Sequence, residues 1–169
     1  MYIFVVIISN YLNMKKIIMI SLVSLMIFAC KSKSATNTNL DNKTEVALKG
    51  NWTITSVTYP GSDVIKVTSF DIDDSRCMVG STWKFISNNN KGNMKLTKAG
   101  CSAFGSDITW FINKEGQFVM KILNDIKARK LKEGYVLKVS NITANSFQLI
   151  DKINVAGNIT DVVYQFSRN

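Results

Sequence analysis

Apolar and polar residues alternate with a period of two along most of the chain after Leu48. The alternation is clearest over residues 83–85, 108–110, 118–122, 135–139, 147–149 and 162–166. Side chains of a β-strand point alternately to opposite faces, so this pattern predicts strands with one buried face. Turn-forming sequences separate the strands, at residues 59–62, 88–93, 113–116, 143–146 and 156–158. The pattern therefore predicts an all-β domain of about eight antiparallel strands over residues 48–169.

Strands connected in chain order can close into an up-and-down barrel or split into a sandwich of two sheets. A barrel leaves no exposed strand edge, and the chain has only 1 proline with which to protect edges otherwise. We therefore expect an eight-stranded antiparallel barrel. Residues 125–132 are the only stretch that suggests a helical turn, and they can equally form a long basic hairpin end.

A short apolar segment precedes the alternating region. Lys15 and Lys16 are followed by thirteen apolar or small residues, 17–29, and then by Cys30. This run is too short to cross a hydrocarbon core about 30 Å thick, so it predicts a cleaved leader; the alternative is a buried cysteine in a transmembrane helix. A second apolar stretch lies upstream without a basic residue before it. Either Met14 is therefore the true start, or the leader has an extended N-terminal part.

The segment around Cys30 resembles the lipobox of bacterial lipoproteins, with a basic start, an apolar run, a small residue and a cysteine before a polar tail. The resemblance implies a signal peptide over residues 1–29 and acyl chains such as palmitate on Cys30, which attach the protein to a membrane. Lys31 and Ser32 include no aspartate that signals inner-membrane retention, so an outer-membrane lipoprotein of the envelope is expected, on the periplasmic or the surface side. Residues 30–47 are polar and predict a flexible tether.

Charge and cysteine content narrow the function classes. Without Lys15 and Lys16, the 21 basic residues exceed the 12 acidic residues by +7. This charge either favours contact with anionic headgroups or cell-wall polymers, or only aids solubility. The absence of histidine removes the usual general base and the commonest metal ligand. Cys77 and Cys101 form an even pair in an exported chain, so we expect a disulfide; two buried, reduced thiols are the alternative.

The domain also resembles a known family of barrels. Gly50 and Trp52 form a Gly-x-Trp at the first strand, residues 77–85 read Cys-Met-Val-Gly-Ser-Thr-Trp-Lys-Phe, and a Gly-Cys pair ends at Cys101. With the strand pattern, these residues resemble the lipocalin-like domains of bacterial envelope lipoproteins, in particular those of the Bacteroidetes lineage. The resemblance implies that Trp52 closes the bottom of the barrel beneath Arg168; otherwise Arg168 is a solvated terminal residue.

Two departures from the lipocalin pattern limit what this resemblance implies. The only echo of the Thr-Asp-Tyr motif is at residues 160–162, on the wrong strand, and the flanking C-terminal helix of full lipocalins is missing. A wide ligand cup is therefore not implied. Inward aromatic residues can line a small cup or fill the barrel outright. The ligand-lining candidates are Trp83, Phe85, Trp110, Phe118, Tyr135, Phe147 and Tyr164. Phe166 is expected to join them on the inside, and Met94 and Met120 either add adaptable lining or fill gaps in the core.

Charged clusters offer less chemistry. An EF-hand loop beginning at Asp71 would need glycine and glutamate where the chain has Arg76 and Thr82, so we expect a solvated acidic loop and no metal. A dense basic cluster, which contacts anionic headgroups or is merely a solvated connection, consists of Lys127, Arg129, Lys130 and Lys132. No nucleophile elbow, paired carboxylates or glycine-rich phosphate loop is recognisable, so neither an enzyme nor a cofactor is expected. An exported lipoprotein is also not expected to bind nucleic acid.

These observations lead to two functional hypotheses for a monomeric barrel. In the first, the barrel holds or carries a small hydrophobic molecule, such as a lipid or fatty acid, near the membrane. In the second, side chains fill the barrel, which is then a structural or interaction module that binds an envelope protein or glycan. An open, apolar mouth favours the first hypothesis, and an exposed aromatic patch on the outside favours the second.

Overall fold

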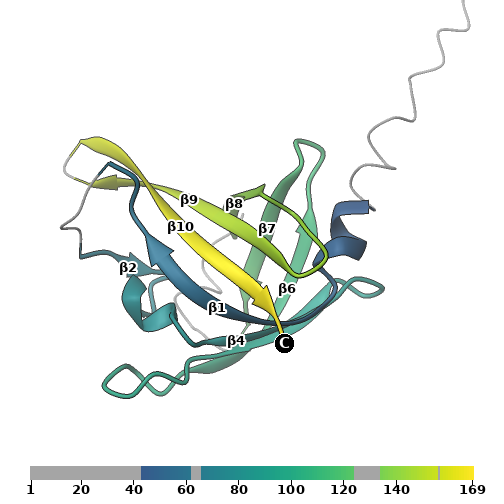
Figure 1. The fold of residues 1–169 in the computed structure, drawn as a ribbon, viewed down its shortest axis with the longest axis horizontal. Helices are drawn as coiled ribbons and strands as arrows, with labels where there is room; N and C mark the ends of the chain where they lie inside the picture. Colours follow the sequence, from purple (N-terminus) through teal and green to yellow (C-terminus); the bar gives the residue numbers. More distant parts are fainter. Residues whose placement is uncertain (1–42, 62–65, 124–133, 156) are drawn as a thin grey trace, which may run out of the picture. The chain divides into compact units, whose positions relative to one another are not determined.

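The computed structural model describes residues 43–61, 66–123, 134–155 and 157–169. The barrel strands are β1 (Gly50–Thr58), β4 (Thr82–Ile86), β5 (Lys91–Lys95), β6 (Gly105–Ile112), β7 (Gln117–Ile122), β8 (Tyr135–Ser140), β9 (Ser146–Val155) and β10 (Asn158–Arg168). They pair in the order β1-β10-β9-β8-β7-β6-β5-β4 and close through β1 and β4, with antiparallel neighbours throughout (Figure 1). The predicted all-β, up-and-down barrel is confirmed, and its order fits a lipocalin-like fold.

All six alternating stretches lie inside strands of this barrel. Strand β5 was not expected, because residues 91–93 were assigned to a turn, and that assignment is wrong. Gly92 explains the difference: it is buried on the inner face of β5, where a Cβ would collide with the carbonyl of Lys84 and press on Ile108. Neighbouring groups therefore fill the space that an apolar side chain would occupy, and the alternation is hidden at this position.

The inner face of the barrel is packed with large side chains. The largest that are fully buried include Trp52, Trp110, Tyr164, Phe85, Phe118, Phe147 and Phe166. Their rings contact one another directly; the centroids of Phe147 and Phe166 are 4.5 Å apart and stacked, and those of Phe85 and Trp110 are 5.3 Å apart. An eight-stranded barrel is just wide enough for such filling, so these rings form the core.

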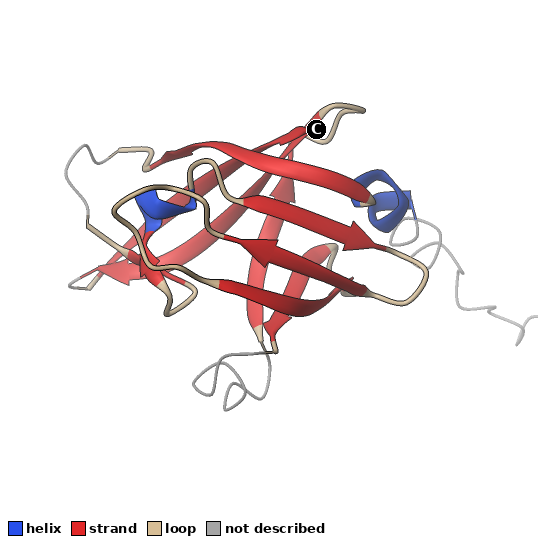
Figure 2. Cartoon of the chain, turned by 90° about the horizontal axis from the view of Figure 1, so that it is seen from below, coloured by secondary structure: helices blue, strands red, loops and turns tan. Residues whose placement is uncertain are grey.

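Two segments outside the barrel lie at its opposite ends (Figures 1 and 2). Residues 43–48 form a short helix before β1. The connection between β1 and β4 contains the two-stranded sheet of β2 (Thr68–Ser69) and β3 (Asp73–Asp74), followed by the 3-10 helix η2 (Ser75–Met78). The expectation that residues 125–132 are the only helical turn is therefore wrong, because residues 43–48 and 75–78 are also helical. That stretch and its basic cluster lie outside the described residues.

The predicted tether over residues 30–47 extends too far toward the barrel. Residues 43–47 are helical. Glu45 accepts hydrogen bonds from the backbone N–H of Ile112 at 3.0 Å and from the side-chain amide of Asn90 at 3.3 Å. Leu48, at the end of the helix, is fully buried. A polar composition concealed this helix because its contacts are with distant strands and not within its own sequence.

The described residues carry a complete domain of their own. Residues Thr36–Asn169 form one compact unit, which contains the closed barrel, both end segments and the disulfide. A polypeptide of residues 36–169 therefore includes every contact described below and its own hydrophobic core, so we expect it to fold alone. The predicted leader and Cys30 lie outside the described residues. Among the residues that are described, no helix has the length and apolar character needed to span a membrane.

Candidate functional site

One end of the barrel is closed by Trp52, and we call it the Trp52 end. The Trp52 side chain is fully buried, donates a hydrogen bond from Nε1 to the carbonyl of Leu48 at 2.8 Å, and packs edge-on against Phe147. Gly50 precedes it with φ of 134°, and a Cβ there would lie 2.5 Å from Nη1 of Arg168. Glycine is therefore required so that Arg168 can approach the ring of Trp52.

Arg168 covers this ring from β10. Its Cζ atom lies 4.1 Å from the ring centroid of Trp52, which is cation–π geometry. The guanidinium also donates to the carbonyls of Ala144 at 2.7 Å, Lys49 at 3.0 Å and Ala47 at 3.2 Å. Cations are favoured near the free carbonyls at the end of a helix. The placement of Gly50, Trp52 and Arg168 is thus the one that the family resemblance implied.

The other end is closed by the β1–β4 connection, and we call it the Phe70 end. We call residues 66–81 of this connection the plug. Phe70 is 4% exposed, and its ring centroid lies 5.4 Å from Tyr164, 5.3 Å from Tyr135 and 6.1 Å from Trp83. A side chain from a connecting segment, and not from a barrel strand, therefore occupies the mouth.

Hydroxyl groups surround Phe70 and bind the plug to the barrel. The hydroxyls of Ser69 and Tyr164 are 2.6 Å apart, and Tyr135 donates from its hydroxyl to the carbonyl of Phe70 at 2.8 Å. A third pair joins the hydroxyls of Tyr59 and Ser75. Each such hydrogen bond contributes only about 1 kcal/mol, because water replaces it when the groups separate. The mouth therefore combines an apolar floor with polar groups suited to the head of an amphiphile.

The backbone that carries Phe70 is strained. Phe70 and Asp71 have φ of 53° and 54°, in the left-handed region that non-glycine residues rarely adopt. Such residues cost on the order of 1–3 kcal/mol each and persist only where the surroundings hold them. They form the turn between β2 and β3, where the N–H of Ile72 donates to the carbonyl of Ser69 at 3.0 Å. This turn and the packing of the Phe70 ring together hold the two residues in this conformation.

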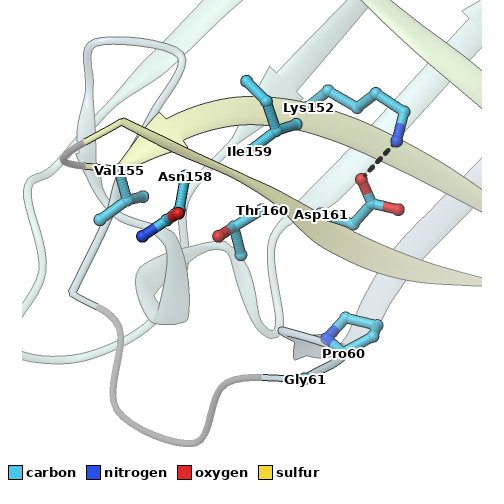
Figure 3. A pocket seen from close by; sticks show the side chains of 8 residues that line it. All are labelled: Pro60, Gly61, Lys152, Val155, Asn158, Ile159, Thr160 and Asp161. Atoms are coloured by element: carbon cyan, nitrogen blue, oxygen red, sulfur yellow. Dashed lines mark hydrogen bonds and ion pairs between the residues drawn. The ribbon is translucent and has the colours of Figure 1, made fainter.

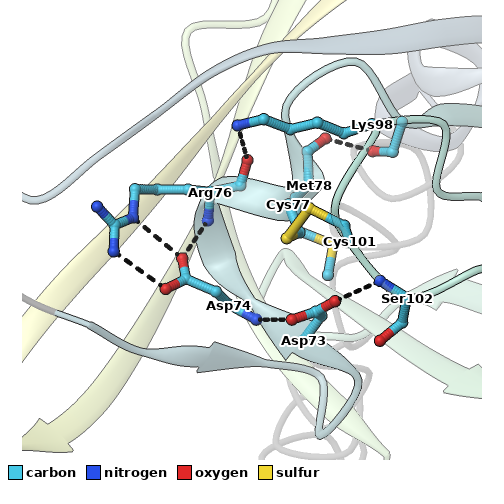
Figure 4. The surroundings of a disulfide bond; sticks show 9 residues. Asp73, Asp74, Arg76, Cys77, Met78, Lys98, Cys101 and Ser102 are labelled. Atoms are coloured by element: carbon cyan, nitrogen blue, oxygen red, sulfur yellow. Dashed lines mark hydrogen bonds and ion pairs between the residues drawn. A yellow bond between two sulfur atoms is a disulfide. The ribbon is translucent and has the colours of Figure 1, made fainter.

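A disulfide joins the plug to the β5–β6 connection. Cys77 and Cys101 are bonded, with a separation of 24 residues, which confirms the expected pair (Figure 4). Asp73 lies beside them and accepts hydrogen bonds from the backbone N–H of Ser102 and Asp74, each at 2.7 Å. These backbone donors, Ser102 first, lower the pKa of the Asp73 carboxyl. The part of the plug from Asp73 onward is thus fixed by the disulfide and by Ser102, and β2 is joined to it through β3 and through the hydrogen bond from the N–H of Ser75 to the carbonyl of Val67 at 2.7 Å.

The acidic residues of the plug are engaged in local contacts. The guanidinium of Arg76 pairs with Asp74 at 3.1 Å and lowers the pKa of that carboxyl, while Asp71 accepts from the Tyr135 hydroxyl at 3.4 Å. One group of metal-ligand types is close enough to share an ion among the described residues, namely Asp73, Cys77 and Cys101. The two sulfurs of that group are bonded to each other, so they offer no thiolate.

Asp151 adds a carboxyl group to the inner face of β9. It follows the inward-facing Phe147 and Leu149 at intervals of two, and burial raises the pKa of its carboxyl. Burial also raises the pKa of the Tyr164 phenol well above its usual range, and the charge of Asp151 adds to that effect. β9 pairs with β8 only from Gln148 to Ile150, so Asp151 lies where these two strands separate.

Three hollows of the described surface lie outside the core. The first has a volume of about 640 Å³ and is bordered by Pro60, Gly61 and the β9–β10 hairpin, where Lys152 and Asp161 form an ion pair at 2.8 Å (Figure 3). A second, of about 670 Å³, lies beside the disulfide. A third, of about 480 Å³, lies against the outer side of β8 and β9. No interior aromatic side chain lines any of the three.

The predicted ligand-lining residues are brought together inside the barrel. Trp83, Phe85, Trp110, Phe118, Phe147 and Tyr164 are buried, and Tyr135 is partly buried. Only Trp83, Tyr135 and Tyr164 reach the Phe70 end; the others fill the depth of the barrel. Sequence reasoning missed Phe70, Ser69 and Tyr59. One feature of the sequence could have indicated Phe70: it is a large aromatic residue directly before the acidic residues 71–74, and such a side chain is unfavourable in a solvated loop.

Comparisons with known proteins give no family. No family model matches the sequence, and the search of curated proteins found no match. Among solved structures, lobster apocrustacyanin A1 aligns over 79% of this chain and 67% of its own, with 13% sequence identity and a TM-score of 0.46. The strand order, and not this similarity, establishes the barrel. A ligand site has to be argued from the residues of this chain.

Proposed function

We propose that the barrel binds a small hydrophobic ligand at the Phe70 end, in the place that the Phe70 ring occupies in the ligand-free protein. The observation that carries this proposal is the insertion of Phe70, on a strained connecting segment, among Trp83, Tyr135 and Tyr164. Barrels of this size either hold one small ligand or fill themselves with side chains. Here the filling side chain at the mouth is one that can leave without breaking a barrel strand.

The dimensions and chemistry of the mouth define the ligand class. Below Phe70 the barrel is filled by Phe85, Trp110 and Phe118, so the ligand is limited to about one or two rings or a short acyl segment. The Tyr164 hydroxyl, which pairs with Ser69 of the plug, would bind a hydroxyl, carbonyl or other polar head when the plug moves. The ligand is therefore a compact amphiphile.

We further propose that the domain is held at an envelope membrane by acyl chains on Cys30. The support is the sequence pattern of basic residues, apolar run and cysteine that resembles a lipobox. The barrel would then exchange its ligand close to a lipid phase. Metabolic labelling with a palmitate analogue tests this attachment: label is expected on the full chain and absent after Cys30→Ser, and label that persists in the variant would contradict it.

A second candidate function is a solid barrel that serves as an interaction module. It is favoured by the continuous contact of interior rings, such as Phe147 stacked on Phe166 and Trp110 stacked on Phe118. In this case Phe70 is a permanent part of the core, and binding takes place on the outer surface.

Titration with 2-naphthol, a fluorescent probe of two fused rings with a hydroxyl group, separates the two functions. We expect residues 36–169 to bind the probe, and Phe70→Ala to bind it at least tenfold more tightly because no side chain competes for the site. Phe111→Ala removes an aromatic ring from the outer wall and is the matched control, expected to leave the affinity unchanged. Native mass spectrometry after incubation with envelope lipids then identifies the natural ligand.

Equal affinities of wild type and Phe70→Ala would overturn the proposal, as would an equal change in Phe111→Ala. Absence of probe binding in all three proteins, together with a bare protein mass after lipid incubation, would favour the solid barrel. The lipid incubation has a direct readout in mass, since a retained compound adds a few hundred daltons that denaturation removes.

A further inference from the structure

The outer wall of the barrel carries an apolar row across β6, β7 and β8. Phe111 pairs with Val119, and Val119 pairs with Val136, so the three side chains lie side by side. All three point outward, since Trp110, Phe118 and Leu137 beside them point inward. Phe111 is 46% exposed and Val136 is 42% exposed, while Val119 between them is covered by its neighbours. Adjacent strands are about 4.8 Å apart, so the row extends over roughly 10 Å.

Lysines border this row. Lys121 and Lys138 are each two residues along the strand from a member of the row, Val119 and Val136 respectively. Lys91 of β5 lies opposite Thr109, which is two residues from Phe111. Lys91 and Lys138 are exposed and Lys121 is partly exposed. Two residues along a strand are about 6.6 Å, which the flexible lysine stem spans easily. We call the apolar row together with these lysines the outer patch: Phe111, Val119, Val136, Lys91, Lys121 and Lys138.

The opposite wall differs in character. β1 presents mainly threonine, serine and asparagine outward. β10 presents Gln165 and Ser167, but also the exposed Ile159, which lies near Lys152. That lysine is paired with Asp161, whereas the outer patch places several lysines around two exposed apolar side chains.

Two acidic residues lie on the same side of the barrel as the outer patch. Asp107 is further along β6, next to Asn93 and away from the apolar row, and Glu115, in the β6–β7 turn, borders one hollow together with Val136 and Lys138.

We propose that the outer patch is a docking surface for an anionic phospholipid bilayer. A bilayer interface places an apolar layer and negative headgroups within a few ångströms of each other, which complements an apolar row bordered by lysines. A nucleic acid supplies the negative charge without the apolar layer. The proposal does not rest on a ligand inside the barrel or on acylation of Cys30, and its failure leaves both of those unaffected.

Co-sedimentation of residues 36–169 with vesicles tests the docking surface without the acyl anchor. We expect binding to vesicles of phosphatidylcholine with 30% phosphatidylglycerol, and loss of binding with phosphatidylcholine alone or at high salt. Lys138→Glu should weaken binding at least tenfold, since a charge reversal removes one attraction and adds one repulsion. Lys84→Glu is the matched control: it makes the same change on β4, diametrically opposite β8 in the strand order, and should weaken binding less than threefold.

Insertion is tested separately by fluorescence. The native tryptophans are buried, so Phe111→Trp adds the single exposed reporter among the described tryptophans, and its emission should shift to shorter wavelength only with anionic vesicles. Equal weakening by Lys138→Glu and Lys84→Glu, or no spectral shift on binding, would overturn the proposal. Self-association of the soluble domain that Phe111→Ser abolishes, without any vesicle binding, would also overturn it and would assign the patch to a second copy of the chain.

Discussion

The two ends of the barrel are closed by different parts of the chain. At the Trp52 end the closing ring belongs to β1, which pairs with β10 and β4 on its two sides, and Arg168 ties that ring to several backbone carbonyls. At the Phe70 end the closing ring belongs to a connection, sits on left-handed backbone and packs against three aromatic rings, and the hydroxyls of two tyrosines bond the backbone and side chain of the plug beside it. Displacement of Trp52 would disturb a strand of the barrel, whereas displacement of Phe70 would disturb only a connection. Under the proposed function, the first closure is therefore structural and the second is reversible.

Truncation of the two closing rings, Trp52 and Phe70, should lower the stability of the domain by different amounts. Trp52→Ala is expected to lower the free energy of unfolding by about 3–5 kcal/mol, because the strand cannot move into the cavity. Phe70→Ala should cost less, about 2–3 kcal/mol, since the plug can collapse into the space. Urea denaturation of residues 36–169 measures both. A Phe70→Ala cost equal to or above that of Trp52→Ala would show that both ends are equally structural.

Removal of the disulfide should loosen the Phe70 end selectively. A disulfide between cysteines 24 residues apart stabilises a chain by about 3.5 kcal/mol, because it lowers the entropy of the unfolded state. The double variant Cys77→Ser and Cys101→Ser should therefore have a free energy of unfolding lower by about that amount. Limited proteolysis is expected to cut within residues 66–81 first. Initial cleavage at the helix of residues 43–48 would contradict this assignment of the disulfide to one end.

Arg168→Gln should weaken the Trp52 end by about 1–2 kcal/mol, because it removes a cation–π contact and charged donors to three carbonyls. Arg168→Lys keeps the charge but not the planar fork, and should recover only part of the loss. Thermal unfolding measures both variants. Probe binding at the Phe70 end should stay unchanged, and an altered affinity would show that the two ends are coupled.

The smallest effect is expected from Asp151→Asn, and it depends on pH. Burial raises the pKa of Asp151 above its ordinary value of 3.8, so folding disfavours the ionised carboxyl. This cost is absent below the ordinary pKa and fully present above the raised pKa. The variant should therefore be more stable than wild type near pH 7 and equal to it near pH 3. Thermal unfolding at both pH values measures this, and a stability gain at pH 3 alone would reverse the sign.

The barrel could be predicted from sequence because its determinants repeat. Inward residues such as Phe118, Met120 and Ile122 recur every second position, and a regular meander has few ways to arrange such strands. Cys77 and Cys101 were predictable as a pair because exported chains seldom keep two free thiols. Trp52 and Arg168 followed from a resemblance and not from any local pattern.

The plug and the N-terminal helix could not be predicted, because their reasons lie in distant residues. Phe70 is buried only because Tyr135 and Tyr164, far along the chain, provide a place for it, and its left-handed backbone has no glycine to indicate it. The role of Glu45 cannot be predicted from its neighbours in sequence, because its partner, the N–H of Ile112, belongs to the distant strand β6. Local patterns report strands well, whereas the segments that decide whether a ligand can enter are defined by tertiary contacts.

Native-state hydrogen exchange tests the difference between the ends most directly. In residues 36–169, the amides of Ile72 and Ser75 are bonded within the plug, while those of Ile112 and Arg168 are bonded at the Trp52 end. We expect the plug amides to exchange through a local opening at least a hundredfold faster than the Trp52-end amides, and to become protected when ligand binds. Equal protection at both ends, at the level of global unfolding, would contradict a reversible closure by Phe70.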